Sequence, residues 1–326
     1  MIYSYIMKCL RAFALFLFGI VLGVSWFPAT TSAASLSIKN ETVLANSVVS
    51  EEKLFEATVN LYCRIKVGNK EVSSTGSGVM IDSRGVILTN AHVAQYFLLN
   101  GEDSKLTADC SVRTGSPAKE AYEAEVLYIS KNWLDKNIDK SAKELSRGTG
   151  ENDFALLYIT STKRGKLPAQ FQAYYPGVTM QLDRDKEVVV AGYPAGDLNF
   201  KGVRNKLKAL TATTTITSLQ TFESGTADLI SLSPSKIASS GVSGGPVVMS
   251  GVVTGIVATM GTSKKKEGAS LRAITLPYIN RVIQSESGLS LASLYTVDLA
   301  ARAKQTEASI STEILSFVEK QIRVSR

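Results

Sequence analysis

The chain has 326 residues, with 36 Lys and Arg, 29 Asp and Glu, three Cys and one His. A single His excludes catalytic zinc sites built on two or three His ligands. The net charge of +7 is mild and scattered, which argues against a nucleic-acid-binding patch. An apolar content of 44% with 20% charged residues is typical of a globular protein. We expect neither a metal nor a cofactor. If an imidazole takes part in the function, it is that of His92.

The N-terminus has the pattern of a secretory signal. Lys8 and Arg11 precede an almost wholly apolar stretch, residues 12–27, and a run of small residues follows it. This order predicts a signal peptide over residues 1–33 with cleavage after Ala33, and hence an exported protein that is periplasmic, cell-surface or extracellular. The alternative is an uncleaved membrane anchor, for which residues 12–27 are shorter than the ~20 residues that span a bilayer comfortably. Contact with a membrane is expected only in that second case.

Two cysteines remain beyond this segment, and both lie on segments that alternate like strands. Cys63 shares a face with alternate apolar residues of 59–67, and Cys110 shares one with alternate apolar residues of 106–112. Both thiols are therefore expected to point inward. Two outcomes stay open: a Cys63–Cys110 disulfide, which an oxidising compartment permits, and two separate buried thiols.

Strand-like runs dominate residues 53–276. Short β-branched and apolar runs alternate with clusters of Gly, Ser, Asn and Asp. Many short strands at close spacing indicate a barrel or a sandwich, and Asp82–Gly85 is typical of a hairpin turn. The expected strands include residues 78–81, 85–89, 155–159, 188–191, 211–217, 246–249 and 252–257.

Helical patterns interrupt and follow the strands. Residues 131–147 are charged and compatible with a helix, and we expect them to form a surface insertion. Residues 277–285 and about 292–323 are predicted as helices, the second one long and partly amphipathic. The basic run 264–266, between glycines, is expected at an exposed hairpin tip.

Three separated motifs carry residues suited to nucleophilic catalysis. His92 follows a predicted strand and Asp153 opens another; by itself, each is more typical of a structural residue than of a catalytic one. Ser243 lies in the loop Gly241–Pro246, directly before a strand. The glycine at 241 allows a turn in which the backbone N–H groups of Gly241 and Ser243 point at the same place, as the oxyanion of a tetrahedral intermediate requires.

Taken together, the motifs follow the order His, Asp, Ser, with spacings of 61 and 90 residues. This arrangement resembles the trypsin-like (chymotrypsin-fold) serine endopeptidases, and most closely their bacterial Deg/HtrA-type branch. The resemblance covers about residues 53–285. It also includes Gly76–Val79 ahead of the histidine and Ala191–Pro194 at the start of the second half.

The resemblance implies an all-β fold of two six-stranded antiparallel Greek-key barrels, with the catalytic residues in the cleft between them. It places a protease domain at residues 53–290, with the N-terminal barrel at about 53–165 and the C-terminal barrel at about 180–285. A helical C-terminal extension, residues 291–326, follows. No PDZ domain is expected, because the residues after 285 are too few for one.

By the same resemblance, Ser243 is the nucleophile of an endopeptidase that passes through a covalent acyl-enzyme. His92 takes the serine proton and returns it to the leaving amine, and Asp153 orients the imidazole. The backbone N–H groups of Gly241 and Ser243 form the oxyanion hole. The implied substrates are proteins or peptides.

Two features distinguish this chain from many animal enzymes of the family. Val242 replaces an Asp that pairs with a newly formed N-terminus, so activation by that ion pair is not expected. Ile237 stands at the base of the primary pocket, where an acid would select Lys or Arg. Together with Ala238 and Met260, it predicts a modest apolar pocket for small or medium aliphatic side chains.

Two other classes of function are weighed against the endopeptidase. A catalytically silent peptide-binding module on the same fold is the main alternative, and the complete set of His92, Asp153 and Ser243 argues against it. An esterase or acyltransferase of the α/β-hydrolase fold is disfavoured, because in that fold the nucleophile precedes the acid and the base.

Overall fold

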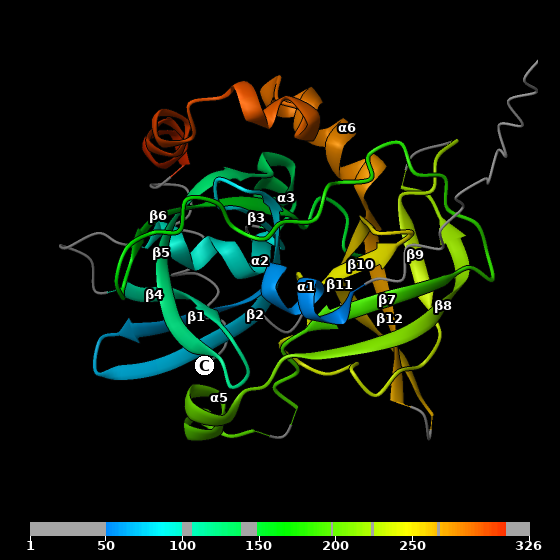
Figure 1. The fold of residues 1–326 in the computed structure, drawn as a ribbon, viewed down its shortest axis with the longest axis horizontal. Coiled ribbons are helices and arrows are strands. Elements are labelled where there is room, and N and C mark those ends of the chain that lie inside the picture. The colour runs from blue at the N-terminus through cyan, green and yellow to red at the C-terminus, as the bar shows by residue number, and fades with distance from the viewer. Residues whose placement is uncertain are drawn as a thin grey trace, which may run out of the picture. The chain divides into compact units, whose positions relative to one another are not determined.

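Two closed β-barrels form the body of the protein (Figure 1). The computed structural model describes residues 50–99, 106–137, 149–196, 198–222, 225–265 and 268–310, without the side chains of Val67 and residues 259–268. The expected signal or anchor segment, residues 1–33, and the end of the expected C-terminal extension, residues 311–326, lie outside this range. Among the described helices, none is long and apolar enough to cross a membrane.

The first barrel closes through antiparallel strands in the order β1-β2-β3-β6-β5-β4. Its strands are β1 (Thr58–Val67), β2 (Lys70–Asp82), β3 (Val86–Thr89), β4 (Leu106–Thr114), β5 (Lys119–Ile129) and β6 (Ala155–Thr162). Alternation along β1 places Val59, Leu61 and Ile65 on one face, and each of them is at most 2% exposed. The hairpin between β2 and β3 is confirmed, since the Gly85 N–H donates to the Asp82 carbonyl at 3.0 Å.

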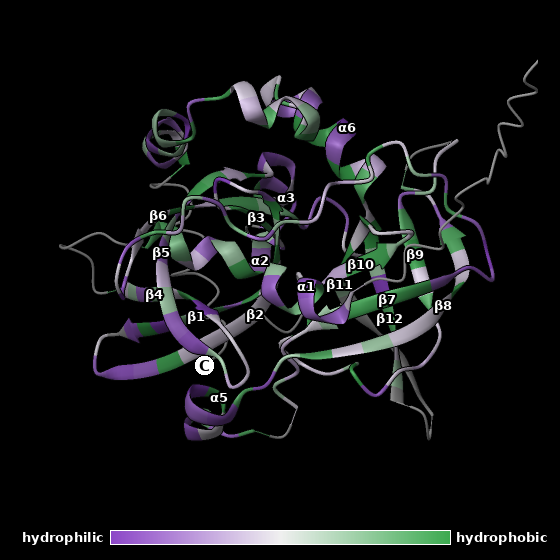
Figure 2. Ribbon diagram, in the orientation of Figure 1, coloured by the Kyte–Doolittle hydropathy of each residue, from purple (hydrophilic) through white to green (hydrophobic). Residues whose placement is uncertain are grey.

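The second barrel repeats this topology with the next strands of the chain. They close in the order β10-β11-β12-β9-β8-β7. Their bounds are β7 (Glu187–Gly192), β8 (Leu210–Gln220), β9 (Leu229–Leu232), β10 (Pro246–Met249), β11 (Val252–Lys265) and β12 (Gly268–Thr275). Strands such as β3 and β10 consist mainly of apolar residues (Figure 2). The expected pair of six-stranded antiparallel barrels is thus confirmed.

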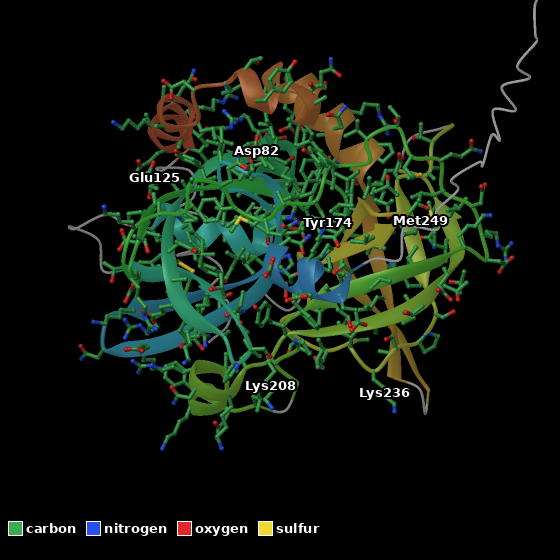
Figure 3. All side chains as sticks on the ribbon, viewed as in Figure 1. Asp82, Glu125, Tyr174, Lys208, Lys236 and Met249 are labelled. Carbon is green, nitrogen blue, oxygen red and sulfur yellow. A yellow bond between two sulfur atoms is a disulfide. The ribbon has the colours of Figure 1, made fainter. Side chains whose placement is uncertain are left out.

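A disulfide joins Cys63 of β1 to Cys110 of β4. The two residues lie directly opposite each other in the antiparallel register between these strands. Their bond crosses the seam at which the first barrel closes, and it is drawn in yellow in Figure 3. Of the two outcomes that the sequence leaves open for these cysteines, the structure therefore has the disulfide.

Short helices connect the strands and follow the second barrel. They are α1 (Glu51–Ala57), α2 (Ala91–Ala94), η1 (Gln95–Leu98), α3 (Lys131–Asn137), α5 (Phe200–Lys206), α6 (Leu276–Ser287) and η2 (Leu291–Thr296), with a further helical stretch at residues 299–310. The helix expected at 277–285 is confirmed as α6. The Thr275 side chain caps its N-terminus, and Gly288, with φ of +70°, ends it.

The single long helix expected from about 292 is wrong. The chain forms the 3₁₀ helix η2, leaves helical geometry at residues 297–298, and starts a new helix at residue 299. The physical reason is local capping. The Ser290 hydroxyl accepts the Ser293 N–H at the start of η2, and Asp298 Oδ1 accepts the Ala301 N–H at 3.0 Å at the start of the next helix.

The expectation of a surface insertion at 131–147 also needs correction. Its first part is α3, in which Trp133 and Leu134 are 3% and 4% exposed. Glu286 of α6 accepts the backbone N–H of Lys131 at 3.0 Å, so a hydrogen bond joins the start of α3 to α6. The many charged residues of the segment indicate an exposed position, whereas the apolar pair Trp133 and Leu134 is buried. Residues 138–148 lie outside the described part.

Candidate active site

His92 and Asp153 come together because their strands pair. β3 and β6 are antiparallel neighbours, and Thr89, the last residue of β3, lies opposite Ala155, the first residue of β6. The helix α2, which carries His92, begins just after β3 ends, and Asp153 lies just before β6 begins. The strand order of the first barrel therefore places the histidine and the acid at one end of this strand pair.

Two hydrogen bonds join these residues. His92 Nδ1 lies 2.7 Å from Asp153 Oδ2, and the backbone N–H of His92 donates to Asp153 Oδ1 at 3.0 Å. The Asp153 side chain is 9% exposed and that of His92 is 32% exposed, so the acid is enclosed while the imidazole stays accessible. A carboxylate beside Nδ1 favours the tautomer with its hydrogen on Nδ1, which leaves Nε2 able to accept a proton.

Asp153 also controls how readily His92 is protonated. Burial lowers the pKa of His92, but the negative charge of Asp153 and its hydrogen bond outweigh burial and raise this pKa above its ordinary value. The imidazolium that forms on proton uptake is therefore stabilised by the adjacent carboxylate. A pair of this kind is suited to general base catalysis near neutral pH.

The backbone around Asp153 is held by residues that the sequence motifs did not single out. Asn90 Nδ2 donates to the Asp153 carbonyl at 2.7 Å, and the Asp153 N–H donates to the Gly150 carbonyl at 3.1 Å. Asn152 has φ of +60°, a conformation that Asn tolerates better than most residues. Its Oδ1 accepts the Tyr278 hydroxyl of α6 at 2.6 Å. The sequence signal was the Asn directly before the Asp, but its partner on α6 is remote in the chain.

The loop that carries Ser243, residues 240–245, is named the serine loop here. Four of its consecutive carbonyls, from Ser240 to Ser243, each accept a hydrogen bond. The Ala195 N–H donates to Ser240 and the Ser77 hydroxyl donates to Gly241, both at 2.7 Å. The Gly245 N–H donates to Val242 at 2.8 Å, and the Ser77 N–H donates to Ser243 at 2.7 Å. Since Ser77 belongs to β2 and Ala195 follows β7, both barrels hold the serine loop.

Some N–H groups of the serine loop donate hydrogen bonds to backbone carbonyls and others do not. Those of Val242, Gly244 and Gly245 donate to backbone carbonyls. Those of Ser240, Gly241 and Ser243 donate to no residue within the described ranges, and the last two are the predicted oxyanion donors. Because the C=O and N–H of a trans peptide point in opposite directions, the bonds to the loop carbonyls also fix the direction of these two donors. Two fixed, free donors of this kind are what a developing oxyanion needs.

Two positions of this loop require glycine both for close backbone contacts and for a positive φ. Gly244 has φ of +84°, and a Cβ atom there would lie 2.1 Å from the Ser77 carbonyl oxygen. Gly241 has φ of +90°, and its Cβ would lie 2.5 Å from the Tyr193 carbonyl oxygen. Any side chain would push the serine loop away from the segments that hold it.

The Ser243 side chain is partly buried. Over the residues for which the structure gives side chains, its hydroxyl makes no hydrogen bond, so no bond joins it to His92. In substrate-free hydrolases, contacts between nucleophile and base often tighten only when substrate binds. The structure thus joins His92 and Asp153 as a hydrogen-bonded pair and holds Ser243 on a separate, hydrogen-bonded loop.

Comparison with known families agrees with this geometry. The family model of the trypsin-like peptidase domain matches residues 76–256, more than half of the chain. The chain belongs to the trypsin-like peptidase family. No curated protein matches it. The matched range of this trypsin-like peptidase contains His92, Asp153 and Ser243 as well as the free N–H donors of Gly241 and Ser243.

The expected substrate pocket of the trypsin-like peptidase is described only in part. Ile237 is 2% exposed and packs within the apolar core of the second barrel, and Ala238 is partly buried against the same core. The Met260 side chain lies outside the described part. The apolar pocket therefore stays a prediction. A cavity of about 560 Å³, lined by residues such as Phe55, Tyr122 and Phe171, lies elsewhere and includes none of these positions.

Among the residues that the structure describes, no three His, Cys, Asp or Glu side chains lie close enough together to hold a metal ion. The chemistry that the site offers is that of a hydroxyl, an imidazole, a carboxylate and two backbone N–H groups.

Proposed function

We propose that the protein is an exported serine endopeptidase that hydrolyses peptide bonds with His92, Asp153 and Ser243. The observation that carries this proposal is the His92–Asp153 bond of 2.7 Å, together with the free N–H groups of Gly241 and Ser243, which are fixed in direction. Family membership supports a peptidase in general, and the geometry supports these residues in particular.

The proposed reaction has two stages. Ser243 Oγ attacks the carbonyl carbon of the scissile bond while its proton passes to His92 Nε2, and the N–H groups of Gly241 and Ser243 donate to the resulting oxyanion. The C–N bond then breaks, His92 gives its proton to the leaving amine, and an acyl-enzyme remains. A water molecule attacks this ester by the same route, which releases the acid and restores the Ser243 hydroxyl. Asp153 stays ionised and stabilises the imidazolium.

Two observations favour export. The first is the N-terminal pattern of Lys8, Arg11 and the apolar stretch 12–27. The second is the Cys63–Cys110 disulfide, since disulfides persist in oxidising compartments and are rare in the cytosol. The likeness to the Deg/HtrA-type branch belongs to the same proposal and rests on the motifs around His92 and Ser243.

A catalytically silent peptide-binding module is the second candidate. The observation that favours it is the missing bond between the Ser243 hydroxyl and His92. Against it stands the stabilised His92–Asp153 pair, for which peptide binding alone has no use.

Cleavage of an unfolded protein separates the two candidates. The wild type is expected to fragment casein over hours, and Ser243→Ala to leave it intact, because the variant lacks the attacking oxygen. Gel electrophoresis and mass spectrometry of the products give the measurement. Ser250→Ala, in the turn after β10, is a matched control that should cleave as the wild type does. Intact casein with a folded wild type, or equal cleavage by Ser243→Ala, contradicts the proposal.

A further inference from the structure

Ser77 of β2 forms hydrogen bonds with the serine loop. It is 0% exposed. Its hydroxyl donates to the Gly241 carbonyl at 2.7 Å and accepts the Tyr193 N–H at 2.9 Å. Its own N–H donates to the Ser243 carbonyl at 2.7 Å, and its carbonyl accepts the Thr89 hydroxyl at 2.7 Å. Every polar group of Ser77 therefore forms a hydrogen bond, and two of them, the hydroxyl and the N–H, bind the serine loop.

The Ser77 hydroxyl connects two separate segments of the second barrel. One is Tyr193–Ala195, after β7, and the other is the start of the serine loop. The Ala195 N–H in turn holds the Ser240 carbonyl at 2.7 Å. The Ser240 carbonyl and the free Gly241 N–H belong to one peptide group. The direction of the Gly241 N–H therefore depends on how the segment Tyr193–Ala195 is joined to the serine loop.

We infer that Ser77 is a positioning residue that locks the serine loop from the opposite barrel, so that the Gly241 and Ser243 N–H groups are aimed at substrate before it binds. This inference rests on the proposed function. In this inference, the buried Ser77 hydroxyl of the first barrel supports the Gly241 and Ser243 N–H donors, which belong to the second barrel.

Val242 shows why the loop needs such support. It is 0% exposed and packs in the apolar core of the second barrel, where it cannot form an ion pair. An uncharged loop must take its shape from hydrogen bonds instead. Without the Ser77 hydroxyl, the buried Gly241 carbonyl and Tyr193 N–H both lose a partner, which favours rearrangement of the loop. A rotation that turns the Ser240 carbonyl toward the substrate would repel the oxyanion.

The test is Ser77→Ala, assayed for kcat and KM separately. We expect kcat to fall at least about tenfold, since loss of one oxyanion donor alone costs ~10²–10³ in kcat. KM should change little, because the donors act on the transition state more than on bound substrate. A peptide boronate, which forms a tetrahedral adduct with the serine, should bind more weakly by the same factor as kcat/KM.

Thr254→Val is the matched control. Thr254 is also 0% exposed, and its hydroxyl donates to the Val247 carbonyl of β10 at 3.1 Å rather than to the serine loop. It should lose stability in urea as Ser77→Ala does, yet keep wild-type kcat. Ser77→Cys, which retains a weak donor, should fall between Ser77→Ala and the wild type and serves if the alanine variant does not fold.

The outcomes separate this inference from the proposed function. Wild-type kcat in Ser77→Ala, or equal losses of kcat in Ser77→Ala and Thr254→Val, overturns the positioning role while the peptidase assignment stands. A folded wild type that is no more active than Ser243→Ala overturns the proposed function itself. The NMR ring signal of His92, the one histidine of the chain, should titrate unchanged in Ser77→Ala, which shows that the His–Asp pair is intact.

Discussion

The variant His92→Ala is expected to lose at least about three orders of magnitude in kcat/KM. The serine hydroxyl is a weak nucleophile near neutral pH and needs a base to take its proton. The chain has one histidine, so no second imidazole replaces it. The measurement is steady-state cleavage of a fluorogenic peptide with an aliphatic side chain before the scissile bond.

Two controls make this result specific. Tyr175→Ala changes a side chain that is 80% exposed and should cleave at the wild-type rate. The double variant His92→Ala/Ser243→Ala should be no slower than either single variant, because residues that act as one unit are not additive. Wild-type activity in His92→Ala would remove the histidine from the mechanism.

Asp153→Asn is expected to lower kcat by about 10⁴-fold at neutral pH. The Asn amide can present its N–H₂ to His92 Nδ1, which favours the tautomer with hydrogen on Nε2 and leaves no acceptor for the serine proton. It also removes the carboxylate charge that stabilises the imidazolium. Asp109→Asn, at an exposed ion pair with Arg64, is the matched control and should keep wild-type kcat.

The raised pKa of His92 predicts how kcat/KM changes with pH. In the wild type the pKa of His92 is raised, so kcat/KM should rise with pH and reach half its maximum above about 6.5, the ordinary value. In Asp153→Asn only burial remains, and burial lowers the pKa of His92, so the midpoint should move to lower pH. NMR titration of the single histidine measures both midpoints directly. A midpoint that is unchanged or higher in the variant would contradict the electrostatic role of Asp153.

Local sequence patterns predict many of the strands, whereas the two six-stranded barrels are implied by the family resemblance. Alternation marks Val59, Leu61 and Ile65 as one strand face, and the run at 246–249 coincides with β10. The glycine at 241 indicates a turn, and the structure shows a positive φ and a close backbone contact there. The break at residues 297–298 does not follow from the apolar periodicity around it, because its signal is the helix cap formed by Asp298.

Contacts between remote segments could not be predicted from the sequence. Asn152 meets Tyr278 across 126 residues, and Ser77 meets Gly241 across 164 residues. No short pattern encodes such pairs, since they depend on how the barrels and α6 pack. The Cys63–Cys110 bond is similar: each strand face was predictable, but the register that sets the cysteines opposite each other was not.

Covalent labelling with a fluorophosphonate tests the central claim most directly. The reagent reacts with a serine only when a base and oxyanion donors activate it, and peptide mass mapping locates the adduct. A single adduct on Ser243 is expected in the folded wild type, none in Ser243→Ala or in denatured protein, and greatly slowed labelling in His92→Ala. A folded wild type that stays unlabelled, or an adduct on a different serine, would contradict the account.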